Sequence, residues 1–359
     1  MAYTTIDDGS VYFQTTLYTG NAGALNIVNG GNSDLQPDLV WLKDRGATNS
    51  HRIVDSSRGV QKALRSNSAD TEGTDTGLVT AFNSDGFSHN STDTAWNGSG
   101  DTYIAWQWKA NGGTRTTFTE SGVNPGGGYQ VNTTAGFSIV DYTGTGGNGT
   151  VAHGLGAVPH VMLFKCRSVG YHWIMYHYKN TSAPETDGIK LDETGATGDY
   201  IFYFQDTAPT SSVFTLGTSS PGDSGFNDDG ATNIAYLWTE IQGFSKFGGY
   251  EGNNNSDGPF IYTGFKPAYF LVKNIDATSA WRIYSNKISN QNGFNDLDRL
   301  FYANTNEAES GTGHVVDFLS NGIKIRGDNE DVNDANTYIY MAFAEHPFVS
   351  SEGVPVTAR

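Results

Sequence analysis

Two Asn/Glu pairs with the same spacing are the first residues of this 359-residue chain that suggest ligand binding. Asn67 precedes Glu72 by five positions, and Asn304 precedes Glu309 by the same distance. An amide and a carboxylate on one loop can bind a polar ligand, and their oxygens are of the kind that Ca²⁺ accepts. Alternatively, each pair holds a turn through hydrogen bonds from side chain to backbone. These four residues are our candidates for a polar ligand site.

Three large rings follow a lysine at a fixed distance of eight residues. They are His51, Trp173 and Trp281, after Lys43, Lys165 and Lys273 respectively. An aromatic face matches the C–H face of a pyranose, so the rings, Trp173 and Trp281 above all, are candidates for sugar stacking. Alternatively, the rings fill the core, because buried aromatic residues dominate β-sandwich interiors. We expect the lysines to end a strand and to reach water or a nearby carboxylate.

No other pattern indicates catalysis, a metal centre or a cofactor. The chain lacks a phosphate-binding loop, a dinucleotide fingerprint, a nucleophile elbow and a His-Glu-x-x-His motif. The acidic segment 328–336 lacks the spacing and the glycine of an EF-hand loop. The single cysteine, Cys166, excludes an internal disulfide, and we interpret it as a strand residue. We therefore expect no enzyme, no cofactor and no metal. A polysaccharide-degrading enzyme is a further alternative, because glycosidase carboxylates are distant in sequence.

The lysine and the ring belong to a pattern that occurs three times. A proline lies six residues before each lysine, and an apolar run joins the two, at 37–43, 159–165 and 267–273. A Tyr-x-Gly precedes each proline, starting at Tyr18, Tyr142 and Tyr250. A second apolar run closes each copy, at 102–108, 232–238 and 337–343. The middle copy lacks the Asn/Glu pair, and we assign only a remnant, 211–214, to that region. The chain thus reads as three versions of one module.

The composition favours short strands joined by glycine turns. There are 45 glycines, charged residues make up only 16%, and we find no amphipathic helix longer than two turns. We predict an all-β fold of three repeated antiparallel β-sandwich modules, of jelly-roll or concanavalin-like type. We predict a polar leader (1–14) and a C-terminal tail (349–359) at the two ends. Between them we predict a first repeat (15–110), a Gly/Thr-rich linker (111–135), a second repeat (136–247) and a third repeat (248–348).

The charge and the hydropathy of the chain exclude some partners. The net charge is −17, and without a basic stripe to neutralise phosphates we expect no nucleic-acid partner. No apolar stretch approaches the roughly 20 residues that span a bilayer, so we expect no membrane span. The N-terminus lacks the basic start and the apolar core of a signal peptide. We therefore expect synthesis in the cytoplasm, followed by assembly.

Several motifs resemble a family of repeat proteins encoded by tailed bacteriophages of marine and freshwater bacteria, cyanobacteria included. They are Tyr-Thr-Gly-Asn from Tyr18, Pro-Asp-Leu-Val-Trp-Leu-Lys from Pro37, His-Arg-Ile-Val-Asp from His51, Ser-Asp-Gly-Phe from Ser84 and Tyr-Ile-Tyr-Met-Ala-Phe-Ala-Glu-His-Pro-Phe from Tyr338. The opening Met-Ala-Tyr-Thr-Thr-Ile-Asp and the closing Gly-Val-Pro-Val-Thr-Ala-Arg are similar too. The resemblance implies a virion structural protein with lectin-like sandwich domains, and it implies no catalytic residue and no ligand.

On this basis we expect a surface-exposed virion protein, tail-associated and of the tail-fibre or adhesin type, that binds host-surface glycan. The alternative is a capsid or tail decoration protein with a purely architectural role. The expected partners are other virion proteins, host glycan and further copies of the chain, with a homotrimer favoured because phage appendages are usually symmetric oligomers. We expect the leader, the linker and the tail to make the contacts within the particle.

Overall fold

Three antiparallel sheets, each with a set of four strands in the same order, form the framework of the chain. The computed structural model describes residues 4–218, 225–288 and 296–345. The first sheet has the order β1 (Phe13–Thr19), β9 (Thr102–Trp108), β3 (Leu39–Asp44), β4 (Arg52–Asp55). The second has the order β12 (Phe137–Thr143), β19 (Thr232–Trp238), β14 (Val161–Cys166), β15 (Ile174–His177). The third has the order β20 (Ser245–Glu251), β27 (Thr337–Phe343), β22 (Tyr269–Asn274), β23 (Arg282–Ser285).

The register of the three sheets is the same as well. Each repeat lysine lies opposite an isoleucine of the closing apolar run, in the pairs Lys43–Ile104, Lys165–Ile234 and Lys273–Ile339. All three isoleucines are fully buried in one common cluster of core residues. The two apolar runs of each copy therefore form neighbouring central strands of one sheet.

The remaining strands extend or cover these sheets. The second sheet continues on one side into β11 (Gly127–Asn132) and β10 (Thr116–Phe118), and on the other into β16 (Asp187–Lys190) and β17 (Gly198–Asp199). The third continues into β24 (Asp296–Tyr302), β25 (Ser310–Leu319), β26 (Gly322–Ile325) and β21 (Phe260–Tyr262). Smaller sheets are β2 (Ala24–Ile27), β8 (Phe87–Asn90) and β7 (Ala81–Phe82), then β13 (Gly149–Ala152) with β18 (Val213–Leu216), and β5 (Lys62–Ala63) with β6 (Gly73–Thr74).

Helical structure in the described residues is limited to single short turns, η1 (Gly9–Val11), α1 (Ile201–Phe204) and α2 (Glu330–Asn333). The predicted all-β fold with antiparallel sheets is confirmed. No helix in the described ranges is long and apolar enough to cross a membrane. Cys166 is buried in β14, as expected of a strand residue.

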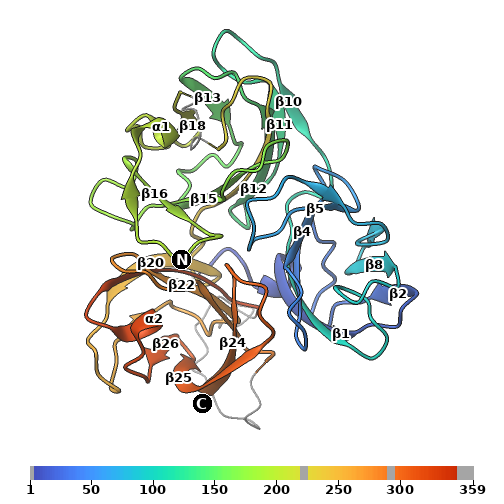
Figure 1. The fold of residues 1–359 in the computed structure, drawn as a ribbon, viewed down its shortest axis with the longest axis vertical. Coiled ribbons are helices and arrows are strands. Elements are labelled where there is room, and N and C mark those ends of the chain that lie inside the picture. Colours follow the sequence, from blue (N-terminus) through green and yellow to red (C-terminus); the bar gives the residue numbers. More distant parts are fainter. Residues whose placement is uncertain (1–3, 219–224, 289–295, 346–359) are drawn as a thin grey trace.

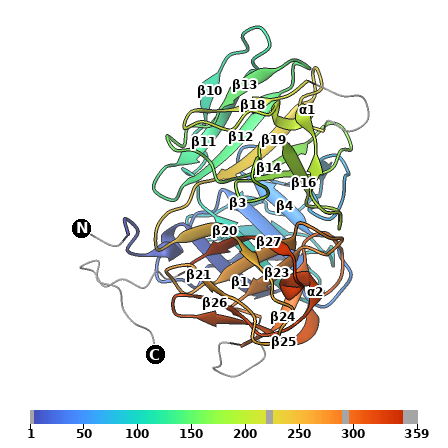
Figure 2. The same ribbon diagram turned by 90° about the vertical axis from the view of Figure 1, so that its left-hand side faces the viewer.

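Three lobes surround a common centre (Figure 1). We define them as residues 4–110, 111–243 and 244–345, coloured blue to cyan, green to yellow, and orange to red. Side chains of all three sheets meet in the largest core cluster, which includes Trp106 of the first lobe, Tyr236 of the second and Met341 of the third. In the turned view of Figure 2, β3 and β4 of the first lobe lie behind the line along which the second and third lobes meet. The lobes thus share one interior.

Each sheet also has a second buried face. Alternate residues of a strand point to opposite sides, so Leu39 and Trp41 of β3 enter the shared core whereas Val40 and Leu42 enter a core of the first lobe alone. The second and third lobes have private cores of the same kind. Burial on both faces explains why the runs after the prolines are apolar throughout, since neither side of the strand meets water.

The Tyr-x-Gly motif marks a close approach of two backbones. A Cβ added at Gly20 would lie 2.3 Å from the Gly98 carbonyl oxygen, and one added at Gly144 would lie 2.4 Å from that of Asp228. Gly252 approaches Asp334 in the same way. Only glycine fits there, because no side chain can share space with a backbone carbonyl. The motif thus fixes the loop that precedes the last central strand of each lobe.

Two segments expected to lie outside the modules are part of the fold. The leader 1–14, described from residue 4, buries Ile6 and Phe13 in the shared core, and Asp8 caps η1. The linker 111–135 contains β10 and β11, and β11 pairs with β12 along its whole length. A few apolar residues such as Ile6 are enough to fix the leader on the fold, because the shared core already offers an apolar surface for them to pack against. The tail 349–359 lies outside the described residues.

Candidate functional site

The rings at lysine plus eight lock neighbouring lobes together. Trp173 Nε1 donates to the Arg65 carbonyl of the first lobe at 2.7 Å, and Trp281 Nε1 donates to the Lys190 carbonyl of the second lobe at 2.9 Å. His51 Nε2 lies 3.0 Å from the Tyr302 carbonyl of the third lobe. The contacts form a closed cycle in which each lobe reaches into the next. We call these contact regions the joints.

All three rings are buried, so they belong to the core and do not offer a face to a sugar. Trp41 Nε1 donates to His51 Nδ1 at 2.9 Å, which leaves the Nε2–H of a neutral ring to reach Tyr302. Burial lowers the pKa of His51 to about 3, and nearby Lys43 contributes to that shift. The neutral ring therefore donates on one side and accepts on the other.

The Asn/Glu pairs serve the same joints. The side chain of Asn67 accepts a hydrogen bond from His51 N, and that of Asn304 accepts one from Trp281 N, at 3.0 and 2.9 Å. Both asparagines thus make side-chain-to-backbone bonds, but these join residues 16 and 23 positions apart and do not hold a local turn, the alternative considered from the sequence. In the described residues, no group of three or more His, Cys, Asp or Glu side chains is arranged to hold a metal ion.

The second lobe has its own version of the pair, which sequence reasoning missed. Asp192 accepts a hydrogen bond from Trp173 N at 3.0 Å, and Thr197, five residues later, donates its backbone N–H to Ile275 of the third lobe at 2.9 Å. The segment lies 19 residues after the ring, at 192, and not at the remnant 211–214. The five-residue spacing and the similar shapes of Asp and Asn were the available signal.

The glutamates of the pairs bridge lobes by ion pairs. Glu309 lies 2.6 Å from Nε of Arg45 in the first lobe, and Glu72 accepts from Arg167 of the second lobe at 2.9 and 3.0 Å. The backbone N–H groups of both glutamates donate to the carbonyls of the same arginines at 2.9 Å. The position equivalent to Arg45 and Arg167 is Ile275, so the joint between the second and third lobes has no such ion pair.

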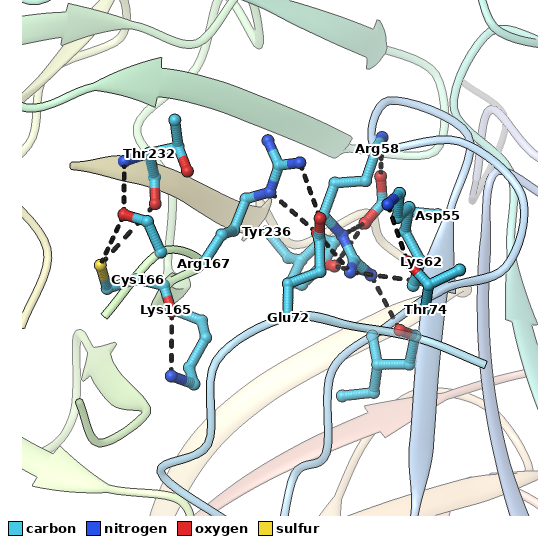
Figure 3. A network of polar contacts seen from close by, with 12 residues as sticks. Asp55, Arg58, Lys62, Glu72, Thr74, Lys165, Cys166, Arg167, Thr232 and Tyr236 are labelled. Atoms are coloured by element: carbon cyan, nitrogen blue, oxygen red, sulfur yellow. Dashed lines mark hydrogen bonds and ion pairs between the residues drawn. The ribbon is translucent and has the colours of Figure 1, made fainter. Parts of the chain in front are cut away.

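The joint between the first and second lobes contains a buried ionic network (Figure 3). The side chains of Asp55 and Arg58 are both fully buried and form an ion pair. Tyr236 of the second lobe donates its hydroxyl to Asp55 at 2.6 Å, and Arg58 also contacts Glu72 at 3.1 Å. Glu72 in turn binds Arg167, so the network extends across both lobes.

The interactions within this network favour the charged forms of Arg58 and Glu72, although burial opposes charge on both. Burial alone would lower the pKa of Arg58, but the interactions with Asp55, Tyr236 and Glu72 outweigh it, and the pKa is raised. Burial would likewise raise the pKa of Glu72, yet its contacts with Arg167 and Arg58 hold that pKa below its usual value. Arg58 donates further bonds to the Ile53 and Lys62 carbonyls, so its guanidinium is fully satisfied without water.

The repeat lysines differ from the expectation that they reach water or a carboxylate. Lys43, Lys165 and Lys273 are each fully buried, because their strands are covered on both faces. Their ammonium groups donate to backbone carbonyls instead, two of them to the next lobe: Lys165 to Ala69 and Lys273 to Thr194, both at 3.1 Å. Burial lowers the pKa of each lysine to about 8. Lys165 and Lys273 therefore also serve the joints, whereas Lys43 donates to the Asp44 and Ala47 carbonyls of its own lobe.

A cleft opens where the ion pair is missing. It has a volume of about 630 Å³ and is lined by Thr197 and Ile275, by the neighbouring Asp199 and Asp276, and by Lys179. Thr197 donates its hydroxyl to Asn180 at 2.6 Å and so uses its side chain inside the second lobe. Because neither Thr197 nor Ile275 spans the gap as Glu72 and Arg167 do, this joint stays open at the surface.

A second cleft, of about 420 Å³, lies between the second and third lobes near the start of β20. Its lining includes His160, Glu240, Gln242, Lys246 and Tyr262. We call it the β20–β21 cleft. Lys246 Nζ lies 2.8 Å from Glu240 Oε2, and the ring of Tyr262 is 60% exposed. Tyr262 ends β21, which follows β26 at the border of the third sheet (Figure 2).

The comparisons with known proteins place these features within one family. A family model described as a domain of unknown function (DUF7483) matches residues 8–347. No curated protein and no solved structure matches the chain. The match covers the three sheets, all of the joints and both clefts, so the chain belongs to the family described as domain of unknown function DUF7483.

Proposed function

We propose that the chain is a non-enzymatic structural protein at the surface of a tailed-bacteriophage particle, associated with the tail, and that it contacts host-surface glycan there. The observation that carries the structural part is the use made of the repeated polar residues. His51, Trp173 and Trp281 bind neighbouring lobes, and so do two of the three repeat lysines, Lys165 and Lys273. Side chains that could have bound a ligand thus hold the three lobes together as one rigid block.

The motifs that resemble phage repeat proteins support placing this block in a virion. Of those motifs, His-Arg-Ile-Val-Asp contributes His51 and Asp55 to two different joints. The run from Pro37 contributes the buried Lys43. One of the resembling motifs therefore takes part in holding the lobes together, and this suits a protein whose role depends on a rigid shape.

A decoration protein with a purely architectural role is the second candidate, and one observation favours it. The three lobes form a cycle around a shared core, which gives a single chain the outline of a trimer (Figure 1). Such a block could occupy a position of threefold symmetry by contact with other virion proteins alone. We propose assembly with further copies or with other virion proteins in either role.

Cryo-electron microscopy of intact particles tests the proposal. We expect density for three lobes on the outside of the tail, and its absence from the particle would refute a virion role. Particles that lack the protein decide between the two candidates. Loss of adsorption to host cells supports the glycan-binding role, whereas normal adsorption with altered particle stability supports decoration. Host cells incubated with the purified full chain supply a second measurement, because an adhesin competes with the phage for adsorption.

A further inference from the structure

We propose that the β20–β21 cleft is a binding site for a neutral saccharide, with the ring of Tyr262 as its stacking surface. The inference deepens the proposed function and rests on it for its biological meaning. None of the residues that the sequence offered for ligand binding lies in this cleft. Its volume of about 420 Å³ falls within the range of roughly 300–1,000 Å³ typical of small-molecule sites.

Tyr262 presents an aromatic face at the surface. β21 alternates, with Phe260 and Tyr262 exposed at 46% and 60% on either side of the buried Ile261. A Cβ at Gly322, on the neighbouring strand, would lie 2.6 Å from the Phe260 ring, so that ring lies flat over the glycine. Tyr262 instead lines the cleft. An exposed aromatic beside a cleft provides the apolar surface that the C–H face of a pyranose requires.

The other lining residues offer hydrogen bonds in the pattern that sugar hydroxyls need. The side-chain amide of Gln242 is exposed and makes no hydrogen bond with the residues that the structure describes. An amide supplies both donors and an acceptor. Lys246 Nζ donates to Glu240 Oε2 at 2.8 Å, while Glu240 Oε1 already accepts Phe247 N and the Tyr178 hydroxyl. The ammonium and Oε2 retain bonding capacity beyond that contact. A hydroxyl, which donates and accepts, can bridge such a pair.

His160 adds a fixed donor. Its Nδ1 accepts the backbone N–H of Glu240 at 3.1 Å, so the neutral ring carries its proton on Nε2. Burial lowers the pKa of His160, which keeps the ring neutral. In the described part of the chain Nε2 has no hydrogen-bond partner. The backbone thus sets the tautomer that gives the cleft a donor.

The charge balance selects a neutral ligand. Lys246 and Glu240 neutralise each other across their ion pair, and His160 is uncharged. The chain as a whole carries −17, which disfavours the approach of an anionic polysaccharide. A peptide would require a row of unpaired backbone groups or a deep apolar pocket, whereas this cleft offers one ring and scattered side-chain polar groups.

Saturation-transfer NMR on the full-length protein tests the site. The probes are the methyl glycosides of glucose, galactose, mannose and N-acetylglucosamine at millimolar concentration. We expect transfer to the ring protons of at least one of them. Tyr262→Ala should weaken that binding by about tenfold, the equivalent of about 1.4 kcal/mol. Tyr262→Phe, which retains the ring face, should bind as the native protein does. Gln242→Ala should weaken binding several-fold.

Ile201→Ala is the matched control, because Ile201 is a similarly exposed side chain, at 51%, on α1 of the second lobe. Absence of transfer to any of the four glycosides would overturn the proposal, as would equal transfer from the native protein and from Tyr262→Ala. Loss of binding in Tyr262→Phe would overturn the stacking argument. Particle microscopy tests the virion role separately. If the protein binds sugar but is absent from the particle, the virion role alone is refuted. If the protein is present in the particle but does not bind sugar, this binding site alone is refuted.

Discussion

Replacing Asp55 by asparagine should strongly destabilise the chain, since it removes one charge from a fully buried ion pair. Asp55 accepts Arg58 N at 2.9 Å and the Tyr236 hydroxyl at 2.6 Å, and it also pairs with the guanidinium of Arg58. An asparagine amide would point N–H groups at donors. Breaking a buried pair costs about 3–5 kcal/mol, and because Glu72 still neutralises part of the Arg58 charge, we expect about 3 kcal/mol.

Equilibrium urea unfolding, followed by the fluorescence of the seven tryptophans, measures this loss. Asp141→Asn is the control, because the Arg115–Asp141 pair has side chains 34% and 20% exposed, and such pairs contribute under about 1 kcal/mol. The double variant Asp55→Asn, Arg58→Met should cost less than the sum of the single changes, since neither charge remains unpaired. If Asp55→Asn costs no more than Asp141→Asn, the buried network does not stabilise the joint and our reasoning is wrong.

Three further predictions concern the joints and the shared core. Acidification from about pH 6.5 toward pH 4 should lower the free energy of unfolding. In the folded protein the pKa of His51 is about 3 and that of His177 about 4, both below the pKa of an unfolded histidine. The unfolded chain therefore binds more protons than the folded protein in this pH range. Urea titrations at several pH values check this, and a flat profile would contradict it. Trp281→Ala should cost about 3–5 kcal/mol by urea unfolding, as large core truncations do, whereas a cost under about 1 kcal/mol would mean that the ring is not packed as described. Deleting residues 1–14 should lower the melting temperature in calorimetry, because Phe13 packs against Trp108 and Phe343, and an unchanged melting temperature would refute a structural role for this segment.

The sequence predicted the elements better than it predicted their partners. The apolar runs and the prolines located the central strands, because burial on two faces leaves a continuous apolar pattern. Of the two alternatives for Trp173 and Trp281, the burial of both rings agrees with the core and not with a sugar platform. The joints were not predictable, since Trp173 and Arg65 are 108 residues apart and nothing local indicates that they meet.

The lysines, the leader and the β20–β21 cleft were not predicted correctly because each depends on segments that are distant in sequence. The repeat lysines were expected at the surface because a buried ammonium needs partners, and backbone carbonyls as partners leave no mark in a sequence. The leader was expected to lie outside the modules, because its few apolar residues do not indicate the apolar surface that other segments provide for Ile6 and Phe13. The β20–β21 cleft was missed for the same reason, because His160 and Tyr262 come from different lobes.

The contact of Arg45 with Glu309 has a consequence for how the protein is made. These residues are 264 positions apart, and their pairing closes the cycle of lobes. During synthesis the first lobe must wait for almost the entire chain before its last partner emerges, and contacts so distant in sequence slow folding. Meanwhile its exposed edge can accept the third lobe of another chain, since the docking surfaces are the same. Exchange of lobes between nascent chains is therefore the characteristic misassembly of this architecture, and a slow ribosome or crowded polysomes would favour it.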